Sequence, residues 1–428
     1  MLDFSNGHLS WNAIRRLLRE CGMACMLCIT TYGMYLNYFL GGVVWSNIVA
    51  AVSVVLVANW KNVASLHFPS QSRLFFLFSL FFLVSLFYAL VSGFRGMEKI
   101  IYFLLFSFCA YVAFMSTNVG RDFDFDEFLV VALLLSSCLA VLNFYCLMNG
   151  LIVDYVDVEA VKYEERNVLE RFTMSGGSVV NVFVSLWAYR RRCLPSVISW
   201  VLLLLVLIDL YVILALGKRT PLVVSLVSIA VFVFWGGFRF RINWGFIAVA
   251  FAAVPLLDSG FFFENFESFK ERFVSGMSEI FTGEAVGDVH TSGIARYELR
   301  EKAWNRMARE FSFGNYVFGM GYNSLGQIDN PLLQAYFEMG LVGFGAVLLS
   351  VLMPFVLLFG RWRRLWYIQF AAMCPLYQAL AVLNSGNPYF FGRWSALGVC
   401  LFFVANVHRA RPQGEVGSAP SKNPLIGR

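Results

Sequence analysis

Residues 331–359 read PLLQAYFEMGLVGFGAVLLSVLMPFVLLF, and Glu338 is the only charged side chain in this run. A helix that crosses the hydrocarbon core of a bilayer needs roughly 20 mainly apolar residues. The run exceeds that length, and Pro331 suits the first helical position, where no amide partner is needed. Asn330 can cap the helix by accepting a hydrogen bond from the first free amides. A membrane-spanning helix is therefore predicted from Pro331 to Phe359.

Similar apolar runs recur along the whole chain. Hydrophobic residues make up 59% of the 428 residues, charged residues make up 14%, and the mean hydropathy is +0.67. A soluble protein needs a larger share of polar residues to cover its surface. We therefore predict an all-α, polytopic membrane protein with about twelve transmembrane helices. The predicted spans are residues 22–40, 41–58, 74–92, 98–117, 128–149, 173–189, 196–216, 220–237, 243–257, 331–359, 365–384 and 394–408.

The positions of lysine and arginine predict the orientation. Basic residues beside a short loop resist transfer across the membrane. One side of the predicted bundle holds more than half of the 33 cations, so this side and both termini are predicted to be cytoplasmic. The net charge of +6 reflects this distribution, and no nucleic-acid partner is predicted. The cations on this side are Arg15, Arg16, Arg19, Lys61, Arg73, Arg121, Arg190, Arg191, Arg192, Arg239, Arg241, Arg361, Arg363, Arg364, Arg409, Arg411, Lys422 and Arg428.

The longer polar segments divide the chain. Residues 1–257 contain the first nine predicted spans and a short outer loop near residues 150–172. A long outer loop follows over residues 258–330, and residues 331–408 contain the last three spans. The final segment, 409–428, has few apolar residues and is predicted to be a disordered cytoplasmic tail.

Two amphipathic helices are predicted in the long outer loop. Residues 266–280 and 294–310 both place apolar side chains at three- and four-residue steps. In the second helix, Arg296 and Arg300 stand one turn apart, so both guanidinium groups can share one face. Arg296 opens the predicted helix, where a cation opposes the macrodipole, and this favours a functional role. For Arg300, a functional role and membership of the ion pairs of a solvated helix stay equally open.

Two more arginines and one carboxylate lie where predicted helices meet the outer surface. Arg171 and Arg219 are close to hydrocarbon, where an ionisable group is unfavourable unless it pairs, snorkels or lines a polar cavity. Asp329 lies beside the start of the helix at Pro331. The polar residues are thus expected to gather on the outer face rather than at the membrane midplane. Arginines bind phosphate bidentately and a carboxylate can accept a proton from a hydroxyl, so an anionic lipid substrate is predicted.

No metal or cofactor is predicted. Cys21, Cys25 and Cys28 share helical spacing, but no histidine or acidic residue accompanies them within the apolar span. Metal sites in proteins combine such cysteines with further ligands in tetrahedral sets. A place in the helix core is therefore favoured for these three cysteines.

Several motifs resemble the O-antigen polymerase and O-antigen ligase superfamily, whose members are polytopic bacterial GT-C-type glycosyltransferases. They are the run from Arg296 to Trp304, the Gly319-Met-Gly-Tyr turn and the segment at 329–343. The Lys218-Arg-Thr turn and the segment at 171–177 also resemble the arginine positions of that family's outer face. Ligases typically carry a histidine at the position of Asp329, so the resemblance is closer to the polymerases.

The resemblance implies a polymerase that joins undecaprenyl-pyrophosphate-linked repeat units at the periplasmic face of the bacterial inner membrane. The donor oligosaccharide and membrane lipid would be its partners, and a polysaccharide chain-length regulator is a candidate partner. The resemblance implies that Asp329 activates the acceptor hydroxyl while Arg219 and Arg296 hold the leaving pyrophosphate. It further implies substrate-binding roles for Arg171, Arg300 and Asn330.

Two alternatives remain for the function. One is an O-antigen ligase that transfers finished glycan to a lipid A core or another acceptor. The other is a flippase or transporter of lipid-linked oligosaccharide, although transporters usually carry polar residues at the midplane. His290, the only histidine in the long loop, remains an alternative general base to Asp329.

Overall fold

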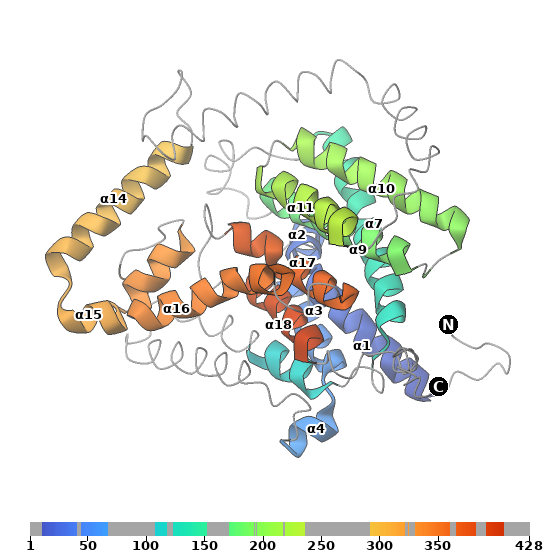
Figure 1. The fold of residues 1–428 in the computed structure, drawn as a ribbon, viewed down its shortest axis with the longest axis horizontal. Coiled ribbons are helices and arrows are strands. Elements are labelled where there is room, and N and C mark those ends of the chain that lie inside the picture. The colour runs from blue at the N-terminus through green and yellow to red at the C-terminus, as the bar shows by residue number, and fades with distance from the viewer. Residues whose placement is uncertain are drawn as a thin grey trace, which may run out of the picture.

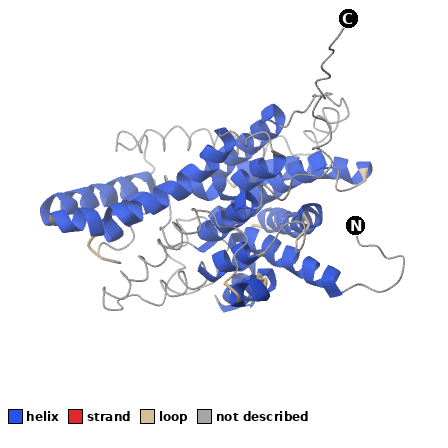
Figure 2. Cartoon of the chain, turned by 60° about the horizontal axis from the view of Figure 1, so that its bottom comes forward, coloured by secondary structure: helices blue, strands red, loops and turns tan. Residues whose placement is uncertain are grey.

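The computed structural model describes residues 11–40, 44–66, 108–117, 123–151, 171–191, 193, 195–216, 219–235, 292–321, 324, 330–359, 365–381 and 391–405. These residues form helices and contain no β-strand (Figures 1 and 2). The predicted all-α class is therefore confirmed for the described part of the chain.

Most helices form one bundle around a shared hydrophobic core (Figure 1). The bundle helices are α1 (Trp11–Leu27), α2 (Ile29–Leu40), α3 (Val44–Val57), α7 (Phe125–Met148), α9 (Arg171–Arg191), α10 (Ser196–Ala215), α11 (Arg219–Trp235), α17 (Trp366–Ala381) and α18 (Phe391–Ala405). The short α4 (Trp60–Ala64) follows α3, and residues 108–116 are also helical.

The remaining helices extend to one side of the bundle (Figure 1). They are α14 (Ser292–Glu310), α15 (Phe313–Phe318) and the beginning of α16 (Pro331–Phe359). Beyond a kink at Gly340, α16 continues into the bundle, where Leu357 and Leu358 join the core. We call α14, α15 and the part of α16 before Gly340 the arm.

Two helices are long and apolar enough to cross a membrane, α7 (Phe125–Met148) and α16 (Pro331–Phe359). Shorter apolar helical stretches occur at Asn47–Val57, Val201–Ala215, Thr220–Phe234 and Ser395–Val404. Length and composition thus identify two candidate membrane spans in the described residues. The predicted total of about twelve spans stays a prediction.

Several helix boundaries coincide with those expected from the sequence. The bounds of α16 are the predicted ones, and α14 begins only slightly before the predicted residue 294. Helix α7 starts at Phe125, ahead of the predicted residue 128, because Asp124 caps it. The Asp124 carboxylate accepts hydrogen bonds from the amides of Asp126 (2.9 Å) and Glu127 (3.2 Å), which favours a helix start at this point.

The prediction of one helix over residues 22–40 is wrong. Helix α1 begins earlier, at Trp11, and the chain bends at Cys28 before α2 starts. The β-branched residues Ile29, Thr30 and Thr31 follow the bend, and such side chains lose rotamer freedom in a helix. The polar residues before Cys21 continue α1 as an amphipathic segment that average hydropathy does not detect.

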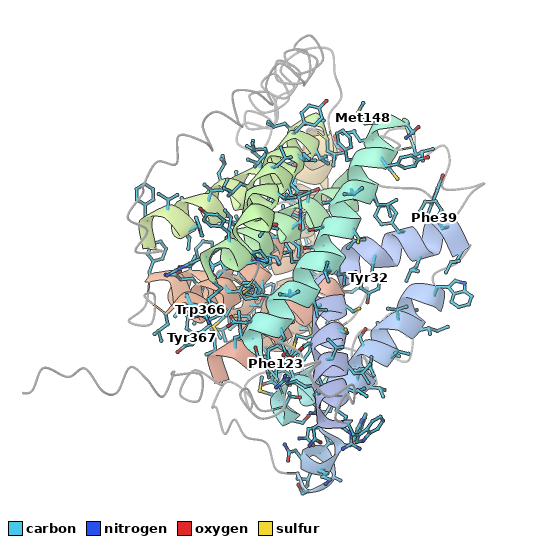
Figure 3. All side chains as sticks on the ribbon, turned by 90° about the vertical axis from the view of Figure 1, so that its right-hand side faces the viewer. Tyr32, Phe39, Phe123, Met148, Trp366 and Tyr367 are labelled. Carbon is cyan, nitrogen blue, oxygen red and sulfur yellow. The ribbon has the colours of Figure 1, made fainter. Side chains whose placement is uncertain are left out.

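The bundle has two distinct ends (Figure 3). Phe123 and Trp366 lie toward one end, which we call the aromatic end, and Met148 and Phe39 lie toward the other, the Met148 end. At the aromatic end, the ring centroids of Phe125 and Trp366 are 4.5 Å apart and join α7 to α17. Edge-to-face contacts of this kind contribute beyond the apolar area that they bury.

Contacts along the helices define their directions. Helices α7 and α9 are antiparallel, because Asp126 contacts Arg191 at one end and Asn143 contacts Ser178 toward the other. Helix α10 returns from the end of α9, and α11 then runs parallel to α9, with Phe232 beside Trp187. Both α9 and α11 therefore begin at the Met148 end and finish at the aromatic end.

Candidate functional site

The arm holds α14 against the first turns of α16. Ala303 and Met307 of α14 pack with Leu333 and Phe337 of α16 in a small buried cluster. Phe311, just after α14, places its ring 5.0 Å from that of Phe337. The later residues of α14 therefore face the later residues of this part of α16, so the two helices run side by side in the same direction.

Two glycines allow α15 and α16 to touch through their backbones. Gly319 (φ +79°) ends α15, and Gly340 (φ +61°) forms the kink in α16. A Cβ atom on Gly319 would collide with the carbonyl group of Glu338, and one on Gly340 would collide with the carbonyl group of Val317. Only glycine adopts such positive φ values without strain, so both positions require it.

The turn after Gly319 also satisfies carbonyl groups next to the kink. The amide of Met320 donates to the carbonyl oxygen of Phe337 (2.8 Å), and the amide of Gly321 donates to that of Glu338 (3.1 Å). A break in a helix deprives the carbonyls of the preceding turn of their usual amide partners. The turn at residues 319–321 and the kinked α16 thus form one unit, although the chain separates them.

Arg306 fastens Ser324, which follows this turn, to α14, a role that the sequence analysis missed. Its Nη1 donates to the carbonyl oxygen of Ser324 (2.7 Å) and its Nε to the carboxylate of Glu310 (2.8 Å). Its guanidinium carbon lies 5.8 Å from the ring centre of Phe337. The local sequence shows only the Glu310 pair, since the contacts with Ser324 and Phe337 depend on the tertiary fold.

The structure places part of the predicted site at this junction. Asn330 caps α16, as predicted: its Oδ1 accepts from the Leu333 amide (3.1 Å). Half-buried Arg300 precedes Ala303 by about one turn, as Asn330 precedes Leu333. Arg300 and Asn330 thus each precede, by about one turn, a residue of the buried cluster that joins α14 to α16. Asp329 is outside the described residues.

The prediction that Arg296 opens its helix is wrong. Helix α14 begins at Ser292, a full turn before Arg296, because Ser292 and Gly293 are already helical. Arg296 therefore does not open the helix, and the unfavourable macrodipole at the first position does not explain it. The Arg296 side chain, His290 and the predicted helix at 266–280 lie outside what the structure describes.

Arg171 and Arg219 are the first residues of α9 and α11. Both helices begin at the Met148 end, so the two arginines share one end of the bundle. Trp187 of α9 contacts Phe232 of α11. Each of these residues lies several turns after the first residue of its helix, so the two helices begin at a similar level along the bundle. The side chains of Arg171 and Arg219 are outside the described set.

A second polar group lies inside the bundle. The expectation that polar residues gather on one face is wrong for α7, α9 and α10, because their polar side chains pair with one another across the helix interfaces. Asn181 donates to the carboxylate of Asp209 (2.6 Å) and accepts from Ser136 (2.8 Å). The sequence signal was the spacing of Ser178, Asn181 and Ser185 on one face of α9.

Charged residues meet at the aromatic end. Arg16 of α1 donates to both carboxylate oxygens of Glu127 (2.9 and 2.8 Å), and Arg191 of α9 does the same with Asp126 (2.9 and 2.8 Å). Glu20 is fully buried beside them and accepts from the Asp124 amide (2.9 Å). Burial raises the pKa of Glu20 from 4.5 to about 8, despite the opposing effects of that hydrogen bond and of Arg16.

Compared with models of protein families and with characterised proteins, the chain gives no match. An arginine guanidinium, such as that of half-buried Arg300, suits an anionic group such as phosphate. A neighbouring carboxylate suits proton transfer from a hydroxyl.

Proposed function

We propose that the protein is a glycosyltransferase of the bacterial inner membrane that polymerises undecaprenyl-pyrophosphate-linked repeat units of a surface polysaccharide. The proposal includes about twelve spans, cytoplasmic termini and a periplasmic active face. The observation that supports it is the packing of Ala303 and Met307 of α14 with α16, which holds the helix that carries Arg296 and Arg300 against the helix that Asn330 caps. Asp329, the proposed base, is the neighbour of Asn330 in the chain.

The proposed reaction assigns each group a role. The bond between the donor sugar's C1 and the pyrophosphate oxygen breaks, and a glycosidic bond forms between C1 and the acceptor hydroxyl oxygen. The acceptor proton passes to Asp329, and undecaprenyl pyrophosphate leaves. Arg296 and Arg219 stabilise the negative charge on the leaving group, while Arg171 and Arg300 bind phosphate or acidic sugar.

The first test compares arginines of one helix. Arg296→Ala and Arg300→Ala should each shorten or abolish the lipopolysaccharide ladder on a gel, with membrane insertion confirmed by blotting. Arg309→Ala is the matched control, because Arg309 is an exposed arginine of the same helix and should leave the ladder unchanged. Wild-type ladders from both Arg296→Ala and Arg300→Ala would overturn the proposed role of the arm.

Deletion of the gene separates polymerase from ligase. Loss of a polymerase leaves one repeat unit on the lipid A core, because single units can still be transferred. Loss of a ligase leaves polymer attached to the undecaprenyl carrier and an unmodified core. The second outcome would assign the protein to the ligase branch.

The buried carboxyl of Asp209 favours a transporter as the second candidate function. Transporters place polar and ionisable groups inside the membrane, where such groups are otherwise unfavourable. Deletion of a transporter would leave carrier-linked repeat units on the cytoplasmic leaflet, out of reach of an impermeant glycan-binding reagent added from outside. Carrier-linked units accessible from the outside after deletion would exclude this candidate.

A further inference from the structure

Asp209 is a fully buried carboxyl in an apolar helix. It is the only charged residue of α10 and has no exposed surface. Its Oδ2 accepts a hydrogen bond from Nδ2 of Asn181 (2.6 Å), and the Ser178 hydroxyl also lies beside the carboxylate. Its Oδ1 has no hydrogen-bond partner within the part of the chain that the structure describes. One carboxyl oxygen atom is thus buried without a hydrogen bond from these residues.

The hydrogen bonds around Asp209 all run toward it. Ser136 and Ser137 donate to Oδ1 of Asn181 (2.8 and 3.2 Å), which leaves the amide group of Asn181 to donate to Asp209. In a second branch, Tyr35 donates to Oδ1 of Asn143, and Nδ2 of Asn143 donates to the Ser178 hydroxyl (3.1 Å). Asp209 is the final acceptor of this arrangement, which we call the Asp209 network.

No cation faces the carboxyl from the neighbouring helices as far as they are described. Helices α7, α9 and α11 pack against α10, and their charged side chains occur only at helix ends. These residues are Asp126, Glu127, Arg171, Arg190, Arg191 and Arg219. The titratable groups that join the network are the Tyr35 hydroxyl and the Cys146 thiol beside it. A negative charge would therefore be buried without compensation, which is strongly unfavourable.

We propose that Asp209 forms a proton-binding site inside the bundle, with Asn181 and Ser178 as its fixed hydrogen-bond partners. A bound proton removes the buried charge, and its place is Oδ1, which accepts no hydrogen bond from the described residues. A metal cation is less well matched, because it requires several oxygen ligands and Asn181 presents an N–H group instead. The site holds whether the protein is a polymerase, a ligase or a transporter.

The site would couple proton occupancy to the packing of α10. Release of the proton would place a carboxylate between α9 and α10 and weaken their contact. Helix α10 leads directly into α11, whose first residue is Arg219. The proton on Asp209 thus stabilises the packing of the helix that precedes α11 in the chain.

Infrared spectroscopy tests the site directly on the full-length protein in lipid nanodiscs. The difference between wild type and Asp209→Asn at neutral pH should contain one carboxylic-acid C=O band, and Asp209→Glu should shift this band rather than remove it. Glu20→Gln, at another buried carboxyl, is the matched control and should leave the Asp209 band in place. A difference spectrum that contains only a carboxylate band would overturn the proposal, and it would leave the polymerase proposal untouched.

Thermal unfolding provides a second measurement. Asp209→Asn should unfold within a few degrees of the wild type at about pH 6, because it replaces the neutral acid by a neutral group of similar shape, and should resist alkaline pH better. The contrary result is a sodium-specific effect. The melting temperature of the wild type would rise in sodium chloride but not in choline chloride, and that of Asp209→Asn would rise in neither. This result would show that the site binds a metal cation rather than a proton and would refute the proposal.

Discussion

The buried carboxyl of Glu20 should make the stability of the aromatic end depend on pH. Its carboxyl is fully buried, and burial raises its pKa from 4.5 to about 8. Between these two values the folded protein keeps a proton that the unfolded chain has released. Stability from this group is therefore present at acidic pH and is lost as the pH rises through about 8.

Glu20→Gln should remove this component of the pH dependence. The neutral amide imitates the protonated acid, so the variant should lose less thermal stability than the wild type between about pH 5 and about pH 8. The measurement is the unfolding temperature in detergent across this range. Glu310→Gln, at an exposed carboxylate paired with Arg306, should follow the wild-type curve. Parallel curves for Glu20→Gln and the wild type would show that Glu20 is already ionised in the folded protein.

Asn330 and Asp329 allow capping to be separated from chemistry. Asn330→Ala removes the hydrogen bond to the Leu333 amide and should destabilise the start of α16 by about 1 kcal/mol. The lipopolysaccharide ladder should largely survive this change, whereas Asp329→Ala should abolish it and leave a single repeat unit on the core. Blotting checks insertion of both variants. Equal loss of the ladder in both variants would indicate that Asp329 has only a structural role. His290 would then be the remaining candidate for the general base.

At the scale of elements, the contact between α15 and α16 depends on glycine. Gly340→Ala would place a Cβ against the carbonyl group of Val317 at a positive φ, so α15 must move away from α16. The hydrogen bonds from Met320 and Gly321 to α16 should be lost with it. Because Arg306 of α14 donates to the Ser324 carbonyl just after this turn, the packing of α14 against α16 should loosen as well.

Gly340→Ala should therefore make the arm more sensitive to limited proteolysis. If the arm carries the chemistry, the amount of polymer should also fall at least tenfold. A tenfold lower rate corresponds to a loss of about 1.4 kcal/mol in transition-state stabilisation. Gly345→Ala is the matched control on the same helix, because a Cβ there meets open space. It should leave both protease sensitivity and polymer unchanged. A Gly340→Ala protein with wild-type behaviour in both assays would show that the junction tolerates separation of α15 from α16.

The sequence predicted individual helices better than their partners. Apolar runs and cap residues located α16 and its Asn330 cap, since both signals are local. The bend at Cys28 was missed because average hydropathy is continuous across it. Arg306 and Asp209 were missed because their partners come from other segments, and only the tertiary fold brings Ser324 and Asn181 to them. The roles of Arg171, Arg219, Arg296 and Asp329 stay predictions.

At the scale of the whole molecule, the contacts at the aromatic end bear on the orientation. Arg16 with Glu127 and Arg191 with Asp126 bring the ends of α1, α7 and α9 together, and the Trp187 indole donates to the Trp366 carbonyl of α17 (3.0 Å). The loops at these ends are among those that the lysine and arginine distribution assigns to the cytoplasm. The structure therefore groups segments that the sequence analysis had placed on one side.

Reporter fusions should confirm this orientation. Alkaline phosphatase, which is active only outside the cytoplasm, should be active when fused after Gly150, because this residue follows α7 at the Met148 end. The same reporter should be inactive after Arg191 or Arg428, where a fluorescent protein that folds in the cytoplasm should be bright instead. The Arg191 fusion is the matched control, because Arg191 ends α9 at the aromatic end, whereas Gly150 follows the adjacent antiparallel helix α7 at the Met148 end. Phosphatase activity after Arg191 but not after Gly150 would invert the bundle and place the starts of α9 and α11, with Arg171 and Arg219, in the cytoplasm. A periplasmic transferase site at those arginines would then be untenable.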